Sequence, residues 1–130
     1  MRSAAEQDPR IVITGLVPDV LPFLVAATVM AIPLFEAGGT RLKILEGFAA
    51  KVPAVTTKNG AEGIDLDNGT QVLLAESAEE FVAAIKRIWT EELVAEHLAI
   101  NGLELVTRAY SWDASSQNII QAVAAVDLGE

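Results

Sequence analysis

The residues best suited to chemistry lie between positions 33 and 57, where an apolar run leads through two glycines into a helix-like pattern. Gly38 and Gly39 would let a ligand approach the backbone closely, because glycine has no side chain in the way. The N–H groups of Gly39, Thr40 and Arg41 at a helix start favour an anion, and the guanidinium of Arg41 is a forked donor suited to phosphate. This turn is therefore a candidate phosphate-binding site.

Glu46 lies one to two turns further along the same predicted helix, where its carboxylate could accept two hydrogen bonds from the hydroxyls of a ribose. Lys43 adds a second cation near Arg41. A plainer interpretation of the same residues stays open: a glycine turn without a ligand, solvated cations, and Lys43 with Glu46 as an ordinary i,i+3 surface pair.

Composition narrows the classes of function. The 130 residues are 52% apolar, which is enough to fill the core of one domain. Eighteen acidic against nine basic residues give a net charge of −9, which would repel a nucleic acid. There is no cysteine and only one histidine, so the usual ligands and nucleophiles of zinc enzymes and hydrolases are lacking and no metal site is expected.

The most apolar window, from Ile11 to Phe35, does not have the pattern of a membrane span. A spanning helix needs about 20 apolar residues in a row, whereas Asp19 and three prolines interrupt this window. Residues 1–10 lack the apolar core of a signal peptide and are interpreted as a flexible N-terminal segment. The sequence thus predicts a cytoplasmic protein without a transmembrane segment.

Short β-branched runs alternate with helix-like periodicities along the chain. Strands are expected at Ile11–Gly15, Val29–Leu34, Pro53–Thr57 and Gln71–Ala75. Helices are expected at Val20–Thr28, at Thr40–Ala50, from Ser77 to Ile88 or Trp89, at about Glu91–Arg108, and from Asp113 or Ala114 to about Val126. The fold class is therefore α/β, a Rossmann-like parallel sheet of about four strands flanked by helices, with two or three C-terminal helices.

The expected helices carry local signals for their starts and buried faces. Asp19 is a potential N-cap, and Ser77 opens a capping box. One helical face holds Leu42, Leu45 and Ala49, and another holds Phe81, Ala84, Ile85 and Ile88. Because ligands of such sheets bind beyond the carboxyl ends of the strands, the loops after Ile13, Phe35 and Thr57 should carry the function.

The run GGTRLKILEGFA at positions 38–49, followed by VPAV at 52–55, resembles the signature of the group 1, family 4-like retaining glycosyltransferases, which have the GT-B fold. The resemblance extends to VITGLVPD at 12–19, GAEG at 60–63 and YSWD at 110–113. It implies that residues 11–130 are part of the C-terminal, donor-binding domain of such an enzyme and end in a crossover-type helix.

The resemblance also implies roles for single residues. Glu46 matches the second glutamate of the family's Glu-x7-Glu motif, which binds the ribose of the nucleotide-sugar. The first glutamate has no counterpart, because Gly38 stands at its position and Glu36 is two residues out of register. Lys51 stands where the family usually has glycine, which suggests a local change in the turn before Pro53. The nucleobase loop corresponds to Gly15, Leu16 and Val17.

Chemistry in the family is transfer of a sugar from a nucleoside diphosphate to an acceptor with retention, without a metal or other cofactor. The Arg/Lys pair that clamps the diphosphate and the N-terminal acceptor domain have no counterpart in this sequence, so we expect a donor-side fragment that is inactive alone. The full-length enzyme could associate with a membrane, and an exposed sheet edge near Ile11–Gly15 invites self-association. Two alternatives stay open: a non-enzymatic α/β interaction module, and a relative of the GT-B sugar epimerases.

Overall fold

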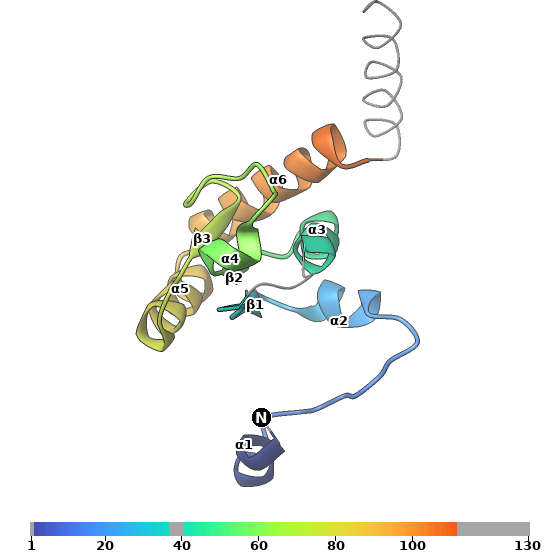
Figure 1. Ribbon diagram of the computed structural model, residues 1–130, viewed down its shortest axis with the longest axis vertical. Helices are drawn as coiled ribbons and strands as arrows, with labels where there is room; N and C mark the ends of the chain where they lie inside the picture. Colours follow the sequence, from blue (N-terminus) through green and yellow to red (C-terminus); the bar gives the residue numbers. More distant parts are fainter. Residues whose placement is uncertain (1, 37–40, 112–130) are drawn as a thin grey trace, which may run out of the picture.

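The structure is a computed structural model that describes residues 2–36 and 41–111. Three parallel strands form one sheet in the order β1 (Met30–Ile32), β2 (Ala54–Thr56), β3 (Val72–Leu74), and Met30 pairs with Ala54, which pairs with Val72 (Figure 1). The helices of the described residues are α1 (Arg2–Gln7), α2 (Leu21–Ala26), α3 (Arg41–Ala49), α4 (Lys58–Ala61), α5 (Ala78–Thr90) and α6 (Glu92–Ala109).

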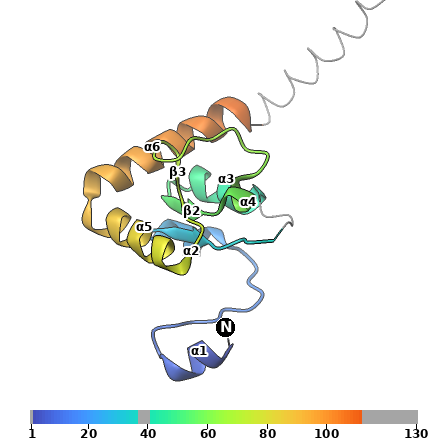
Figure 2. The same ribbon diagram turned by 60° about the vertical axis from the view of Figure 1, so that its left-hand side comes forward.

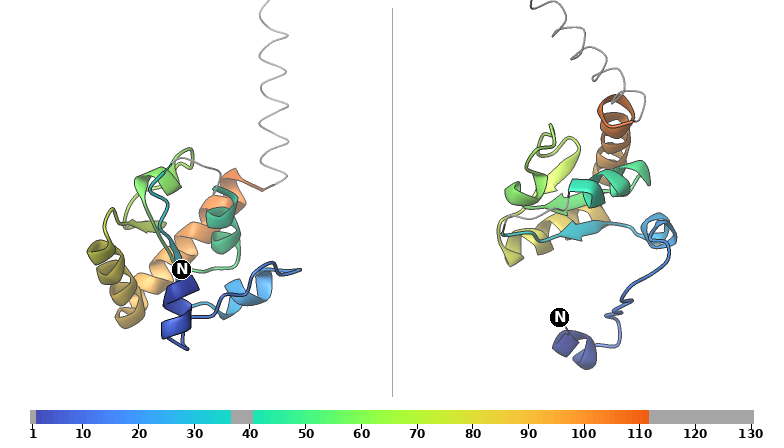
Figure 3. Two further views of the ribbon diagram at one scale, coloured as in Figure 1. Left: turned by 60° about the horizontal axis from the view of Figure 1, so that its bottom comes forward. Right: turned by 45° about the vertical axis from the view of Figure 1, so that its right-hand side comes forward.

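Side chains alternate between the two faces of the sheet and fill a separate core on each. On one face, Ala54 and Val72 contact Ile44 and Phe48 of α3 together with Leu105 of α6. The other core comprises Val55, Leu73 and Ala75 from the sheet side, Phe81 and Ile88 of α5, and Leu98 of α6. Figure 3 shows α3 and α5 on opposite sides of the strands. The protein is therefore a three-layer α/β sandwich, and α6 contributes to both cores.

The strand count is lower than the sequence suggested, because Ile11–Gly15 is not part of the sheet. The side chains of Ile11, Val12 and Ile13 are 45%, 77% and 51% exposed, and residues 8–20 run as an irregular connection from α1 to α2 (Figure 2). A β-branched run shows that residues suit a strand, but a strand also needs a partner backbone. Among residues 2–36 and 41–111, β1 pairs only with β2.

The expected helices α5 and α6 are confirmed within a residue or two at each end. Ser77 Oγ accepts a hydrogen bond from Glu80 N at 3.2 Å, as a helix cap should. The reciprocal bond of the capping box is displaced, since Glu80 Oε2 accepts from the N–H of Glu76 at 2.6 Å. All four residues of the expected stripe on α5 pack in the second core. The final helix expected from Asp113 or Ala114 lies outside the described residues.

The predicted face of α3 is wrong at two of its three positions, since of Leu42, Leu45 and Ala49 only Leu45 packs against the core. Leu42 is 72% exposed and Ala49 is exposed, whereas Ile44 and Phe48 are fully buried. The predicted and the observed apolar stripes are adjacent on the helix surface. Ile44 and Phe48 are the larger pair, and they are the residues that are buried because α3 packs against both the sheet and α6. No helix within residues 2–36 and 41–111 is long and apolar enough to cross a membrane.

Candidate functional site

Glu46 lies on the solvent-facing side of α3, beside the start of α2. A pocket of about 270 Å³ separates the two helices, and its lining comprises Asp19, Val20, Leu21 and Leu24 from the α2 side and Glu46, Ala49 and Ala50 from the α3 side. The pocket therefore places the predicted ribose-binding carboxylate beside a segment that lies 22 to 27 positions earlier in the sequence.

The residues that line this pocket favour one kind of ligand group. Its charged groups are two carboxylates, Asp19 and Glu46, and the rest of the wall is apolar. Carboxylates accept hydrogen bonds from hydroxyl groups and repel phosphate oxygens. One oxygen of Asp19 is already engaged, because it accepts the N–H of Leu21 at 2.9 Å. A ligand group with hydroxyls on an apolar body, as in a nucleoside, fits these walls better than an anion does.

The backbone of α3 fixes where Glu46 stands. The helix ends in a Schellman motif, in which Lys51 N donates to Phe48 O at 3.0 Å and Val52 N donates to Gly47 O at 2.9 Å. Lys51 has φ 59°, the left-handed conformation that glycine favours. The turn before Pro53 therefore keeps the backbone geometry of a glycine turn, and the change that the lysine suggested is not seen.

The structure describes only part of the predicted phosphate-binding turn. Gly38, Gly39 and Thr40 lie outside the described residues. Within the described residues α3 begins at Arg41, whereas the sequence analysis expected its start at Thr40, and Lys43 is exposed on the same helix.

The predicted nucleobase loop is close to the pocket in sequence but does not line it. Gly15 has φ 66°, a conformation that a side chain would strain, and a Cβ there would meet nothing within 4 Å. Leu16 is fully exposed, and Val17 is partly buried. The pocket lining begins two residues later, at Asp19. The structure therefore brings Glu46 together with Asp19–Leu24 rather than with Gly15–Val17.

Side chains after β2 hold the carboxyl ends of the strands together, and sequence reasoning did not single them out. Thr57 Oγ1 donates to Leu34 O, and Asn59 Nδ2 donates to Phe35 O at 2.7 Å. On the other side, Lys58 N donates to Glu76 Oε1 at 2.7 Å. The only signal in the sequence was their place in a loop that follows a strand.

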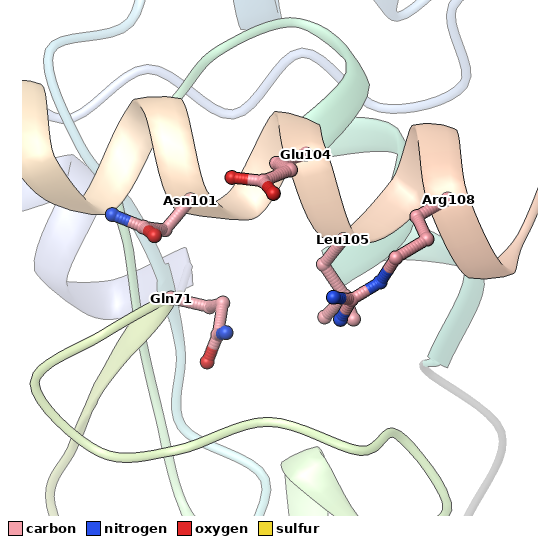
Figure 4. Close-up of a pocket in the computed structure, with 5 residues that line it drawn as sticks. All are labelled: Gln71, Asn101, Glu104, Leu105 and Arg108. Atoms are coloured by element: carbon pink, nitrogen blue, oxygen red, sulfur yellow. The ribbon is translucent and has the colours of Figure 1, made fainter.

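A second cavity lies between α6 and the residue preceding β3, far from Glu46 in the sequence. Figure 4 shows Gln71 across a gap from Asn101, Glu104, Leu105 and Arg108 of α6. Its volume is about 80 Å³, well below the ~300 Å³ at which small-molecule pockets begin. None of the predicted site residues lines it.

Comparison with known proteins identifies the fold and the family. The family described as glycosyl transferases group 1 matches residues 1–91. The crystal structure of the C-terminal domain of a glycosyl transferase group 1 family protein from Francisella tularensis superposes with a TM-score of 0.72 at 22% identity. The match covers 85% of this chain and 60% of that one, so the chain spans less than two thirds of that domain's length. No curated protein matches the chain.

Proposed function

The chain belongs to the group 1 family of glycosyl transferases, and on that basis we propose that it is the donor-side portion of an enzyme that transfers a sugar from a nucleoside-diphosphate-sugar to an acceptor with retention. Residues 11–130 are assigned to part of the donor-binding domain. The chain has no cysteine, which fits the reducing cytoplasm as its location.

The placement of Glu46 is the observation that carries this proposal. Its carboxylate lines a pocket whose other walls are Asp19 and apolar side chains of α2 and α3. In the proposed complex Glu46 accepts hydrogen bonds from the two ribose hydroxyls, and Leu21 and Leu24 provide apolar contact for the nucleoside. At about 270 Å³ the pocket is slightly smaller than sites that enclose a whole ligand. It suits the nucleoside end of the donor, with the diphosphate outside.

The diphosphate would lie toward the start of α3. The first N–H groups of a helix have no partner within it and carry a partial positive charge, which favours an anion. Arg41 is the first residue of α3, Lys43 follows within one turn, and Gly38, Gly39 and Thr40 precede Arg41 in the sequence. These donors would stabilise the charge that develops on the leaving diphosphate, so the proposed reaction needs no metal ion.

The proposal makes this chain a binding unit rather than a complete catalyst. The match covers 60% of the length of the superposed domain, and the partner groups for the diphosphate and the acceptor would come from other parts of the enzyme. We therefore expect the chain alone to bind nucleotide weakly and to transfer no sugar.

Titration of the ¹⁵N-labelled chain with UDP, GDP and ADP, followed by amide NMR, tests the proposal. Binding at the proposed site shifts the amides of residues 15–24 and 38–50 and leaves those of α5 and the end of α6 unchanged. Shifts confined to α5 and α6, or the absence of any shift at millimolar nucleotide, would refute donor binding by this chain.

A further inference from the structure

Side chains continue the bonding between β1 and β2 past the end of the sheet. The last paired residues of these strands are Ile32 and Thr56, and Pro33 has no N–H with which to extend the ladder. Three hydroxyl and amide groups take over: Thr56 Oγ1 donates to Ile32 O at 3.0 Å, Thr57 Oγ1 donates to Leu34 O, and Asn59 Nδ2 donates to Phe35 O at 2.7 Å. Carbonyls of the chain leaving β1 are thereby held by the segment leaving β2.

The segment that provides these donors is itself fixed to the sheet. Thr57 Oγ1 accepts the N–H of Gly60 at 3.0 Å and so caps α4. Gly60 lies so close to β2 that a Cβ on it would be 2.2 Å from Thr56 Oγ1. On the far side, Lys58 N donates to the carboxylate of Glu76 after β3, at 2.7 Å. Hydrogen bonds therefore connect the start of α4, which follows β2, to the segments that follow β1 and β3.

The bond from Asn59 to Phe35 is the last of these links on the chain that runs from β1 to α3. Phe35, whose carbonyl it holds, precedes the first residue of α3, Arg41, by six positions. We propose that Asn59 is a positioning residue: its side-chain amide holds Phe35, the residue from which the chain continues toward α3, in place. The ligand part of this inference rests on the proposed function, in which Arg41 and Lys43 in the first turn of α3 bind the diphosphate.

The chemistry of the side chain makes the inference specific. Asn59 is exposed, so the fold gains little from burying it. Its amide N–H is the donor in the bond to Phe35 O, and a carboxylate of the same shape has no such donor and would repel the carbonyl. Asn59→Asp therefore removes the link without changing the size of the side chain, and Asn59→Gln keeps a donor.

The matched control is Asn101→Asp. Asn101 Nδ2 also donates to a backbone carbonyl at 2.7 Å, but that carbonyl belongs to His97 within the same helix, α6. Both variants lose a hydrogen bond from an amide to a backbone carbonyl, and Asn101→Asp also loses the 3.3 Å contact of Nδ2 with His97 Nδ1. Only the bond of Asn59 connects two separate segments of the chain.

The test compares these variants in the full chain by two measurements. Without ligand, Asn59→Asp should speed amide hydrogen exchange about threefold to tenfold at Leu34, whose N–H donates to Ile32 O at 3.0 Å, and at Gly60, whose N–H donates to Thr57 Oγ1 at 3.0 Å. This is the effect expected of one net hydrogen bond. Asn59→Gln should restore part of the protection, and Asn101→Asp should leave both amides unchanged. With UDP, GDP or ADP, whichever the unaltered chain binds, Asn59→Asp should raise the Kd by a similar factor, whereas Asn101→Asp should leave the Kd unchanged.

The two proposals fail in different ways. Unchanged exchange at Leu34 and Gly60 in Asn59→Asp would overturn the positioning role, whether or not nucleotide binds. Faster exchange with an unchanged Kd would overturn its link to the ligand. If the unaltered chain bound no nucleotide, the proposed function would fail, and the exchange measurement alone would still decide whether Asn59 positions the chain.

Discussion

The ring of Phe48 in α3 lies directly against the backbone of Gly102 in α6: a Cβ on Gly102 would stand 2.7 Å from Cδ1 and 3.0 Å from Cγ of that ring. Phe48 is fully buried and lies two residues after Glu46. The close approach of α3 to α6 therefore depends on the lack of a side chain at Gly102. The distance of Glu46 from the sheet depends on the same contact.

Replacing Gly102 with alanine should lower the free energy of unfolding by about 1–2 kcal/mol. Overpacking against a rigid ring costs about 1–3 kcal/mol, and the better helix propensity of alanine returns up to about 1 kcal/mol. Gly47→Ala is the matched comparison, because its Cβ would meet only the flexible end of Met30, at 2.1 Å from Cε. Urea unfolding should find Gly47→Ala close to neutral. Equal losses in the two variants would contradict this account of the contact.

Lys51→Gly should stabilise the protein by about 0.5–1 kcal/mol. The lysine has φ 59°, a conformation that costs residues with a Cβ about 1–2 kcal/mol, and glycine avoids that cost while losing about 0.5–1 kcal/mol of backbone entropy. Lys86→Gly, on an exposed helical position of α5, serves as the control and should destabilise by about 1 kcal/mol. Thermal or urea unfolding of both variants checks the opposite signs, and destabilisation by Lys51→Gly would show that the strain is absent.

The Asp8–Arg10 pair should show a simple pH dependence. Hydrogen bonds from the side chain and backbone of Arg10 lower the pKa of Asp8 below its ordinary value of 3.8. The pair is therefore intact above about pH 3.8 and is lost as the pH falls through the lowered pKa of Asp8. Arg10→Ala should move the pKa of Asp8 back up toward 3.8, as read from its carboxyl NMR signal. An unchanged pKa would mean that the pair does not form in solution.

Features that depend on neighbours in the sequence were predictable. The cap at Ser77 and the stripe of Phe81, Ala84, Ile85 and Ile88 use contacts within one helix turn, and the structure confirms them. The strands β1, β2 and β3 stand out as short apolar runs between turn signals, although each is shorter than expected, and β1 is not buried as β2 is.

Features that depend on partners distant in the sequence were not predictable. Ile11–Gly15 has the composition of a strand but no partner backbone, and the face of α3 was decided by contact with α6. The pocket between Asp19 and Glu46 and the links from Thr57 and Asn59 to the end of β1 join residues more than twenty positions apart. Composition and periodicity contain no information about such pairs, so of the residues that line this pocket only Glu46 was a predicted site residue.

The most direct test of the account is the affinity of Glu46→Gln for the nucleoside diphosphate that the unaltered chain binds, measured by calorimetry beside Glu96→Gln. Both glutamates are exposed on helices, but Glu96 lies on α6, away from the pocket. Loss of hydrogen bonds to a charged group costs about 1.5–3 kcal/mol, so Glu46→Gln should weaken binding at least tenfold, whereas Glu96→Gln should bind as the unaltered chain does. Equal affinity of Glu46→Gln and the unaltered chain would contradict the proposal that Glu46 binds the ribose.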